Sequence, residues 1–503
     1  MNNRQNPVFL LNRLLADFVY LESDEKLSIS GLETDSRRIQ SGDLFVACSV
    51  CGANADAYVR SAINQGAVAV LFEVENKAQH GQLLNDYSVP VIGFYQLSDL
   101  AGSIAARFYS NPSASMQVIG ITGTNGKTSC TQLIAQALTQ QGSVCGVIGT
   151  LGSGLWGALQ HTGFTTPQAV ELQRNLFHMT GEAAAVAVEV SSHALDQGRV
   201  NGVEFDIAVL TNLSRDHLDY HGDMAAYRSA KARLFQWPGL GAAVVNLDDE
   251  LGVRLFAEST ARACFGYRLV AQLPREVEEN VVYAQVVARD LTGVQLSIAS
   301  PWGGFEMKSP LLGQFNVANL MAVFIVLMIQ GFTLEQARAS LEKVKPPAGR
   351  MECFKQPGRP LAVIDYAHTP DALAQVLETL RAHCEGSLWV VFGCGGDRDR
   401  GKRSEMGKAA AEFADQIVLT NDNPRTESPE SIVADIIQGI ADQSRVSVSL
   451  DRQQAIDKAI SAAGEYDVLL IAGKGHEDYQ IIGEQRMAFS DRQVVQNFYT
   501  EAA

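Results

Sequence analysis

The segment VIGITGTNGKTS at residues 118–129 has the residue types of a phosphate-binding loop. An apolar strand pattern is followed by a glycine-containing loop and then by a segment of helical periodicity, which Gly142 ends. In such an arrangement the loop N–H groups and the positive end of the helix point at one position, where a polyphosphate can bind. Lys127 would reach the β- and γ-phosphates and the Thr128 hydroxyl would ligate Mg²⁺. The segment therefore predicts ATP or GTP binding.

This loop departs from the Walker A spacing, because the residue six positions before Lys127 is Ile121 and the nearer glycines give only G-x-x-G-K-T. The alternative is a glycine-rich turn with a solvated lysine. The strand and helix patterns on either side of the loop favour the phosphate site.

Glu189 is unusual because it lies inside an apolar run, VAVEVSS. A buried carboxylate is strongly desolvated unless a cation or a hydrogen-bond network meets it. A Mg²⁺ ion held by the Thr128 hydroxyl would be such a cation, and the alternative is a strand-end glutamate that reaches solvent. His217, in NLSRDHLDYH, also has two interpretations, a metal ligand or a surface histidine.

Lys231 shares one helical face with three apolar residues, Tyr227, Ala230 and Leu234. An ammonium group on such a face must extend to solvent, pair with an acid or change its chemistry. Periodicity by itself favours extension to solvent.

Three α/β segments would position these residues, and we place their boundaries at 1–110, 111–345 and 346–503. The strands of the middle segment are long and uniformly apolar, as in a doubly wound parallel sheet, where ligands bind beyond the carboxyl ends of the strands. The strand ends of the last segment carry both signs of charge, which suits a zwitterionic ligand better than a phosphate. These strand-end residues are Asp365, His368, Gly393, Gly395, Gly396, Asp397, Arg398, Asp422, Asn423, Arg425, Lys474, His476 and Glu477.

Composition limits the classes of protein that remain. The chain has 503 residues, 46% of them hydrophobic, which is enough for several cores. A formal net charge of −16 argues against a polyanion-binding surface, so no nucleic-acid partner is expected.

The sequence has no run of about 18 apolar residues and no cleavage-site pattern, so we expect a cytoplasmic protein without a membrane segment. The single C-x-x-C, Cys48 to Cys51, has no second pair, and reduced thiols are expected.

Over essentially the whole chain the motifs resemble those of the Mur ligases of peptidoglycan precursor synthesis. In chain order they are GTNGKTS, TTP, EVSSHALDQGRV, TNLSRDHLDYH, the AK pair before LF, GQFNVANLMA, PAGRME, DYAHTPDAL, GCGGDRDRGKR, DNPRTE and GKGHEDYQ. The resemblance implies three α/β domains: an N-terminal UDP-substrate domain, a central ATPase domain with a P-loop-type doubly wound parallel sheet, and a Rossmann-like C-terminal amino-acid domain. We expect a monomer.

The resemblance also implies an activity, the ATP-dependent joining of an amino acid to a UDP-muramoyl acid with release of ADP and phosphate. The chain is most similar to the members that add meso-diaminopimelate to UDP-N-acetylmuramoyl-L-alanyl-D-glutamate. Their D-glutamyl side-chain carboxylate would attack the γ-phosphate of ATP to give an acyl phosphate, which the diaminopimelate amine then attacks. Two anions meet in the first step, so Lys127, two Mg²⁺ ions and the loop N–H groups would converge there. Closure of the C-terminal domain would protect the acyl phosphate from water.

Each matching residue takes an implied role from this resemblance. The ATP site would comprise Gly123, Thr124, Asn125, Gly126, Lys127, Thr128, Ser129, Asn319, Arg350 and Asp365. The UDP-substrate site would comprise Thr34, Ser36, Ala53, Asn54 and Ala55 at the uridine end, and Thr165, Thr166, Ser191, Gln197 and Arg199 at the muramoyl dipeptide. The diaminopimelate site would comprise Arg398, Asp422, Asn423, Pro424, Arg425, Gly473 and Glu477. Thr128, Glu189, His217 and Lys231 would hold Mg²⁺, the last as N6-carboxylysine, and Lys127, Lys231 and His217 would be catalytic.

Arg425 would receive the distal carboxylate by which diaminopimelate differs from lysine, because a guanidinium can take a carboxylate through two parallel hydrogen bonds. The alternative is a surface arginine that closes a turn with Glu427. A lysine-adding ligase is the other function within the family. A P-loop regulatory NTPase or kinase is the alternative of a different class, and it would leave Lys231 and the charged strand ends unexplained.

Overall fold

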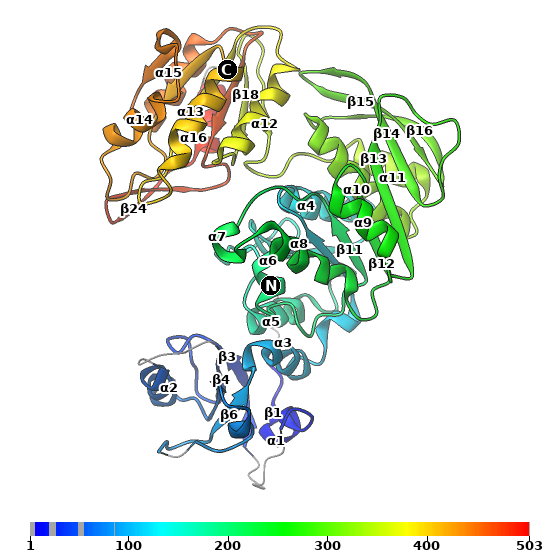
Figure 1. The fold of residues 1–503 in the computed structure, drawn as a ribbon, viewed down its shortest axis with the longest axis vertical. Helices are drawn as coiled ribbons and strands as arrows, with labels where there is room; N and C mark the ends of the chain where they lie inside the picture. The colour runs from blue at the N-terminus through cyan, green and yellow to red at the C-terminus, as the bar shows by residue number, and fades with distance from the viewer. Residues whose placement is uncertain (1–5, 20–26, 49–54, 85, 502–503) are drawn as a thin grey trace. The chain divides into compact units, whose positions relative to one another are not determined.

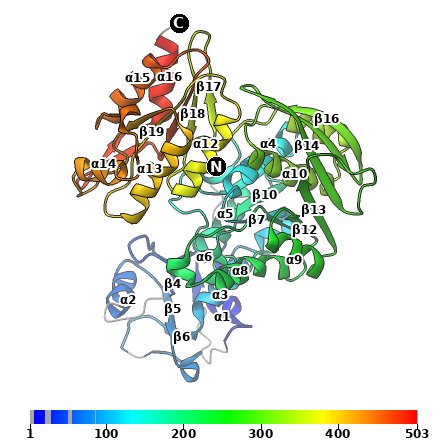
Figure 2. The same cartoon turned by 45° about the horizontal axis from the view of Figure 1, so that its top comes forward.

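The computed structural model describes residues 6–19, 27–48, 55–84 and 86–501. They form α/β structure, in which strands and helices alternate along the chain (Figures 1 and 2). The chain divides into two compact units. Unit 1 comprises Met1–Arg268 with Ala322–Thr333, and unit 2 comprises Leu269–Met321 with Leu334–Ala503. The predicted α/β class is confirmed, while the three predicted domains, with boundaries after residues 110 and 345, stay a prediction.

The first part of unit 1 is a four-stranded parallel sheet in the order β3-β4-β5-β6. Strand residues Leu44 and Leu71 pack in one core with Ile104 and Phe108 of the helix that follows the sheet. The elements of this part are β1 (Phe9–Leu10), α1 (Leu11–Leu15), β2 (Ser28–Ile29), β3 (Gly31–Glu33), β4 (Asp43–Ala47), α2 (Ala55–Asn64), β5 (Ala69–Val74), η1 (Lys77–Gln79), β6 (Val91–Tyr95), α3 (Leu97–Phe108) and η2 (Pro112–Ser115).

The second part of unit 1 is built on strands in the order β13-β12-β11-β7-β10-β8-β9, parallel except for the last pair. Crossovers therefore run to both sides of β7, which is the strand order of a doubly wound sheet. The elements are β7 (Gln117–Thr122), α4 (Lys127–Gln140), β8 (Cys145–Gly149), β9 (Gly152–Leu155), α5 (Ala169–Met179), β10 (Ala185–Glu189), α6 (Ser192–Asp196), β11 (Ile207–Leu210), α7 (Leu218–His221), α8 (Met224–Ala232), η3 (Arg233–Gln236), β12 (Ala242–Asn246), α9 (Glu250–Glu258) and β13 (Ala263–Leu269).

Unit 2 contains an antiparallel run, β14-β15-β16, and a second sheet in the order β17-β18-β22-β19-β20-β21, parallel apart from β17. Helix α10 (Gln314–Ile329) has residues in both units. The other elements are β14 (Val281–Asp290), β15 (Gly293–Ser300), β16 (Gly303–Ser309), α11 (Leu334–Leu341), β17 (Glu352–Phe354), β18 (Leu361–Asp365), α12 (Pro370–Arg381), β19 (Leu388–Phe392), α13 (Gly401–Phe413), β20 (Gln416–Leu419), α14 (Pro429–Ile437), η4 (Gln443–Arg445), β21 (Val446–Val448), α15 (Arg452–Ala462), β22 (Val468–Ala472), β23 (Tyr479–Ile482), β24 (Gln485–Ala488) and α16 (Asp491–Glu501).

The strand before the phosphate loop is buried on both faces, as its apolar pattern predicts. Val118 packs in one core with Leu172 of α5, whereas the alternating residues Ile119 and Ile121 point to the other face and are fully buried too. Helix α4 then ends at Gln140, and Gly142 beyond it has a φ of +84°, which allows the two closing bonds from residues 142 and 143 back to the last turn. The predicted strand, loop and helix are confirmed.

The helix that carries Lys231 is shorter than its apolar periodicity suggests. α8 ends at Ala232, and Leu234 is buried from the 3₁₀ turn η3 instead of from the α-helix. The apolar face therefore continues across a change of helix type. In the part of the chain that the structure describes, no helix is long and apolar enough to cross a membrane.

Candidate active site

The phosphate loop is a turn of residues 123–126 whose shape depends on two glycines, Gly123 (φ +150°) and Gly126 (φ +83°). A Cβ atom on Gly123 would lie 1.9 Å from Oγ1 of Thr211, which follows β11. The next residue on that strand end, Asn212, accepts from the N–H of Thr124 at 2.9 Å through its backbone oxygen. The end of β11 thus holds the loop, and only a glycine fits at position 123.

Lys127 folds over this loop, and its Nζ donates to the carbonyl oxygens of Gly123 and Thr124, both at 2.8 Å. The ammonium group therefore lies at the loop where the N–H groups and the start of α4 would meet a polyphosphate. This location agrees with the phosphate-binding prediction and argues against a solvated lysine.

Glu189, the last residue of β10, is fully buried, so the alternative of a side chain in solvent is wrong. Its Oε2 accepts from the hydroxyls of Thr128 at 2.9 Å and Thr150 at 3.0 Å, and its Oε1 accepts from the Thr150 N–H at 2.9 Å. A hydroxyl and a carboxylate this close are oxygen ligands of the kind Mg²⁺ prefers, alongside nucleotide oxygens and water. The donor set therefore fits a magnesium ion.

Among the described residues no group of three or more His, Cys, Asp or Glu side chains is arranged to hold a metal ion. A cation at Thr128 and Glu189 would need its other oxygens from a substrate, which is the usual way that Mg²⁺ binds with nucleotides. Thr150 was missed by the sequence analysis. Its signal was a hydroxyl placed directly after the apolar strand at 145–149.

Lys231 has only 1% of its surface exposed, so its ammonium group does not extend to solvent. Its Nζ donates to the Gly123 carbonyl at 2.8 Å and lies 4.6 Å from the ring centroid of Tyr227. Burial lowers the pKa of Lys231 well below its ordinary value, and the charge of Lys127 lowers it further. Two lysines therefore donate to one carbonyl oxygen, and the buried one is driven toward its neutral form.

His217 lies at the start of α7 in a left-handed conformation (φ +53°), with its ring 4.9 Å from that of His193 and 6.1 Å from that of Tyr227. Burial lowers the pKa of His217, opposed by nearby Asp216. A neutral imidazole is the form that ligates metal ions. His217 is thus neither a core residue nor an isolated surface one, but part of the cluster around Tyr227.

The five predicted muramoyl-dipeptide residues lie together beyond the carboxyl end of β10. The Thr166 hydroxyl donates to the Glu189 carbonyl at 2.8 Å and accepts from the Ser191 N–H at 3.1 Å. Arg199 donates to the Thr166 carbonyl at 3.2 Å and to Oε1 of Gln197 at 2.9 Å. The last member, Thr165, shares a hydroxyl bond of 3.0 Å with Thr150, whose own hydroxyl contacts Glu189.

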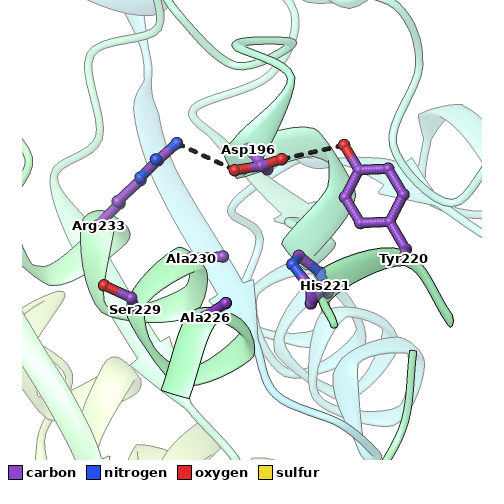
Figure 3. A pocket seen from close by; sticks show the side chains of 7 residues that line it. All are labelled: Asp196, Tyr220, His221, Ala226, Ser229, Ala230 and Arg233. Atoms are coloured by element: carbon purple, nitrogen blue, oxygen red, sulfur yellow. Dashed lines mark hydrogen bonds and ion pairs between the residues drawn. The ribbon is translucent and has the colours of Figure 1, made fainter. Parts of the chain in front are cut away.

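A cavity of about 510 Å³ adjoins this cluster between α6, α7 and α8 (Figure 3). Tyr220 donates to Asp196 at 3.0 Å on one side of it, and Arg233 pairs with the same carboxylate at 3.6 Å. Gln197 in turn donates to the Tyr220 hydroxyl at 3.0 Å. The wall of the cavity is therefore connected to the predicted dipeptide residues through Tyr220, which the sequence analysis missed.

At the uridine end, the turn after β3 is organised by Glu33, whose Oε1 accepts from the N–H groups of Thr34 at 2.9 Å and Asp35 at 3.2 Å. Arg174 of α5 donates to Oε2 of Glu33 at 3.3 Å and so connects this turn to the helix that follows Thr166. Ser36 is buried in the same turn, and Ala55 begins α2. The predicted residues Ala53 and Asn54 lie outside the described residues.

The three predicted nucleotide-binding residues of unit 2 all have buried polar atoms. Asp365 accepts from the N–H of Met351 at 2.8 Å, and burial raises its pKa against the opposing charge of Arg350. The Arg350 guanidinium lies 4.7 Å from the Tyr366 ring centroid, and its buried Nε has no hydrogen-bond partner among the described residues. Asn319 is buried in α10 and donates to Oδ1 of Asn316 at 3.3 Å.

The predicted amino-acid residues meet at the carboxyl edge of the unit 2 sheet. Lys474, fully buried, donates to Oε2 of Glu477 at 3.0 Å, to Oδ1 of Asn423 at 3.2 Å and to Oδ1 of Asp422 at 3.5 Å. The sequence analysis placed Lys474 at this edge but gave it no binding role. Gly473, with φ +111°, allows the sharp exit from β22.

Arg425 is presented by a backbone in the left-handed region (φ +50°), which its N–H bond to the Ile481 carbonyl at 3.1 Å supports. Its Nη1 donates to the Gly396 carbonyl at 2.7 Å. Gly396 lies two residues before Arg398, which is exposed. Glu427 instead pairs with Arg403 at 3.0 Å, so the interpretation of Arg425 as the closure of a turn with Glu427 is wrong.

Comparison with known proteins identifies two family domains in this chain and relatives that match it over most of its length. Residues 121–327 match the model of the Mur ligase middle domain, and residues 349–475 match that of the Mur ligase, glutamate ligase domain. A UDP-N-acetylmuramoyl-L-alanyl-D-glutamate--2,6-diaminopimelate ligase of Coxiella burnetii is 48% identical over 92% of this chain and 94% of its own. The protein of the same name from Pseudomonas aeruginosa is 44% identical over 94% and 95%.

Solved structures agree in fold. A structure of a UDP-N-acetylmuramoyl-L-alanyl-D-glutamate--2,6-diaminopimelate ligase matches with a TM-score of 0.72 and 37% identity over 99% of both chains. A MurF structure from Acinetobacter baumannii matches with a TM-score of 0.63 at 16% identity, over 99% of this chain and 100% of that one. With two domain models matched and relatives similar over nearly their full length, this chain belongs to the Mur ligase family.

Proposed function

We propose that this protein is an ATP-dependent ligase that joins meso-diaminopimelate to the D-glutamyl side-chain carboxylate of UDP-N-acetylmuramoyl-L-alanyl-D-glutamate. The products are the UDP-muramoyl tripeptide for peptidoglycan synthesis, ADP and phosphate. The proposal is supported by relatives that are named for this activity and that match nearly the full chain. The observation that carries the choice of amino acid is the cluster of Arg425, Asn423 and Glu477 at one sheet edge, because it offers both charges to a zwitterion. The enzyme acts as a cytoplasmic monomer.

The first step occurs at the phosphate loop. The D-glutamyl carboxylate attacks the γ-phosphorus of ATP, the bond to ADP breaks and an acyl phosphate forms. Lys127 and the N–H groups at the start of α4 bind the transferring phosphate. Thr128 and Glu189 would hold a Mg²⁺ ion, which offsets the negative charge of the two reacting groups. The residues around Thr166 and Arg199 orient the dipeptide carboxylate.

Lys231 is proposed to carry a carboxyl group on Nζ, formed when the neutral amine attacks CO₂ and loses a proton. Its nearly complete burial and lowered pKa support the neutral amine that this reaction needs. The resulting carbamate is an anion, and together with His217 it would hold a second Mg²⁺ ion. The positive charge next to Lys127 is thereby replaced by a negative one.

The second step joins the amino acid. The diaminopimelate amine attacks the acyl carbon, the amide bond forms and phosphate leaves. Arg425 and Arg398 receive the distal carboxylate, and Gly473 and Glu477 receive the backbone-like and ammonium groups of the same ligand. Lysine lacks the distal carboxylate and would leave Arg425 desolvated, which costs a few kcal/mol, on the order of a hundredfold or more in selectivity.

An ADP-release assay with each amino acid tests this function. ATP consumption should depend on both the UDP-muramoyl dipeptide and meso-diaminopimelate, and L-lysine should be a poor substitute. Arg425→Ala should lose most activity with diaminopimelate while the Michaelis constants for ATP and the UDP-substrate change little. The matched control is Arg359→Ala, which should behave as wild type. In the wild type the Arg359 guanidinium lies 5.2 Å from the ring centroid of Phe498.

Two outcomes would contradict the proposal. Equal efficiency with lysine and diaminopimelate would favour the lysine-adding alternative. ATP hydrolysis that needs neither substrate would favour a regulatory NTPase.

A further inference from the structure

Unit 2 contains a salt bridge between Arg452 and Asp491, and both side chains are completely buried. Arg452 is the first residue of α15 and Asp491 is the first residue of α16. Two parallel bonds of 2.7 Å join them, from Nε to Oδ1 and from Nη2 to Oδ2. This is the forked geometry that arginine forms with a carboxylate and lysine does not.

The guanidinium also binds two backbone carbonyl oxygens at the carboxyl edge of the sheet. Nη2 donates to Ala472 at 2.9 Å, and Nη1 donates to Asn421 at 3.2 Å. Ala472 ends β22 and Asn421 follows β20. In the sheet these two strands are separated by β19, so no ladder of hydrogen bonds joins them directly. Arg452 therefore connects the ends of two strands that are not neighbours.

These two carbonyl groups directly precede the turns proposed to bind the amino acid. Asn421 leads into Asp422 and Asn423, and Ala472 leads into Gly473 and Lys474. The contacts within the proposed site cross from one turn to the other. Lys474 donates to Asn423 at 3.2 Å, and Asn423 donates to Glu477 at 3.2 Å. Their distances depend on the spacing between the two strand ends.

Stability alone is a weak reason for such a pair. Taking both charges out of water is costly, and buried ion pairs can often be replaced by apolar residues without loss of stability. An apolar pair, however, cannot donate to the carbonyl groups of Asn421 and Ala472. What the arginine adds to the contacts within the site is a bond to each of the two carbonyl groups that precede the turns.

We propose that Arg452, held in place by Asp491, is a positioning residue that sets the spacing of the two amino-acid-binding turns and so determines the affinity for diaminopimelate. The inference rests on the proposed function. Arg452 acts through its neighbours in this arrangement, because four of its five N–H donors are used by Asp491 and the two carbonyl groups.

The test is the double variant Arg452→Met/Asp491→Leu, which removes both charges together. The KM for meso-diaminopimelate should rise at least tenfold, while the KM values for ATP and the UDP-substrate change less than twofold. The thermal transition of unit 2 should stay close to that of the wild type. Arg452→Lys, which keeps the charge but not the fork, should also raise the KM for diaminopimelate and is the second variant if the double variant does not fold.

Arg381→Met is the matched control. Arg381 pairs with Asp415 at 2.7 Å and donates to the carbonyls of Cys384 and Gly386, next to the amino ends of β19 and β20. This variant removes a partly exposed arginine that makes the same kinds of bond at the opposite edge of the same sheet, so the KM for diaminopimelate should not change.

An unchanged KM in a folded double variant or in Arg452→Lys would overturn the inference. An equal rise in Arg381→Met would overturn it too, because general loosening of the sheet would then explain the effect. Wild-type enzyme that does not use diaminopimelate would instead refute the proposed function, so the two failures are distinguishable.

Discussion

The most informative single residue is Lys231, because its location leaves an ammonium group few options. Nζ has one carbonyl partner at 2.8 Å and a neighbouring lysine, and no solvent to stabilise its charge. Both burial and Lys127 favour the neutral amine, and carboxylation of that amine gives an anion that can bind Mg²⁺.

We predict that Lys231 is carboxylated in the active enzyme. With ¹³C-labelled bicarbonate, the wild type should give a carbamate signal by NMR that is absent in Lys231→Ala, a variant that folds but does not turn over. The carbamate should be lost as the pH falls, because protonation removes the neutral amine. An unmodified ammonium at Lys231 in an active, Mg²⁺-bound crystal structure would refute this prediction.

Glu189 gives a second prediction at this scale. Glu189→Gln keeps the shape of the side chain, and the hydroxyls of Thr128 and Thr150 can reverse their hydrogen bonds to suit the amide, so the fold should persist. The Mg²⁺ concentration for half-maximal activity should rise by about 10- to 100-fold, the size of effect seen when a partner in a metal site is changed. Exposed Glu182→Gln is the control, and normal activity of Glu189→Gln at ordinary Mg²⁺ would exclude Glu189 from the metal site.

At the scale of elements, the phosphate loop depends on the contact between its glycine and the end of β11. Alanine at position 123 would need both a left-handed backbone and the displacement of the Thr211 hydroxyl, which lies 1.9 Å from the new Cβ. Gly123→Ala should therefore move the loop and raise the KM for ATP at least tenfold.

Gly142→Ala is the matched control for this element, since its φ is also positive but no atom lies within 4 Å of the added Cβ. It should cost only about 1–2 kcal/mol of stability and leave the KM for ATP unchanged. Thermal denaturation and ATP titration measure the two effects. Equal ATP binding by both variants would mean that the loop tolerates the displacement and that the contact with β11 is unimportant.

At the scale of the whole molecule, the two compact units divide the predicted ligand sites. The phosphate-loop and UDP-substrate residues that the structure describes belong to unit 1, and the amino-acid residues belong to unit 2. Because chains with several units often unfold in more than one step, a single melting temperature is not expected.

We predict two calorimetric transitions that respond to different ligands. The UDP-substrate should raise the transition temperature of unit 1, and meso-diaminopimelate should raise that of unit 2. At a ligand concentration of a hundred times the dissociation constant, each ligand should stabilise its unit by about 2.7 kcal/mol. The matched comparison is Arg425→Ala, in which only the diaminopimelate shift should disappear. One cooperative transition that both ligands raise equally would contradict this division.

Much of the fold could be predicted because its signals are local. The apolar run before Gly123, the helical face after Lys127 and the glycine at 142 each depend on neighbours in the chain, and all three elements were confirmed. Thr150 was missed as a site residue, and Lys474 was placed at the sheet edge without a role, since a hydroxyl or a lysine near a strand end has no distinctive pattern until its partners are known. The predicted alternative of an Arg425–Glu427 pair was wrong because Arg403, on helix α13, takes the Glu427 carboxylate.

The sequence by itself determined the α/β class, the phosphate loop, the family and the set of residues at the strand ends, since these depend on periodicity, turn chemistry and motif order. Only the tertiary structure decided the state of the buried charges. Periodicity put Lys231 on an apolar face, but the carbonyl that receives its ammonium group comes from Gly123, 108 residues earlier. Arg452 likewise finds Asp491 39 residues away. A local pattern encodes whether a side chain is buried, whereas the partner that a buried polar group meets depends on which distant segments packing brings together.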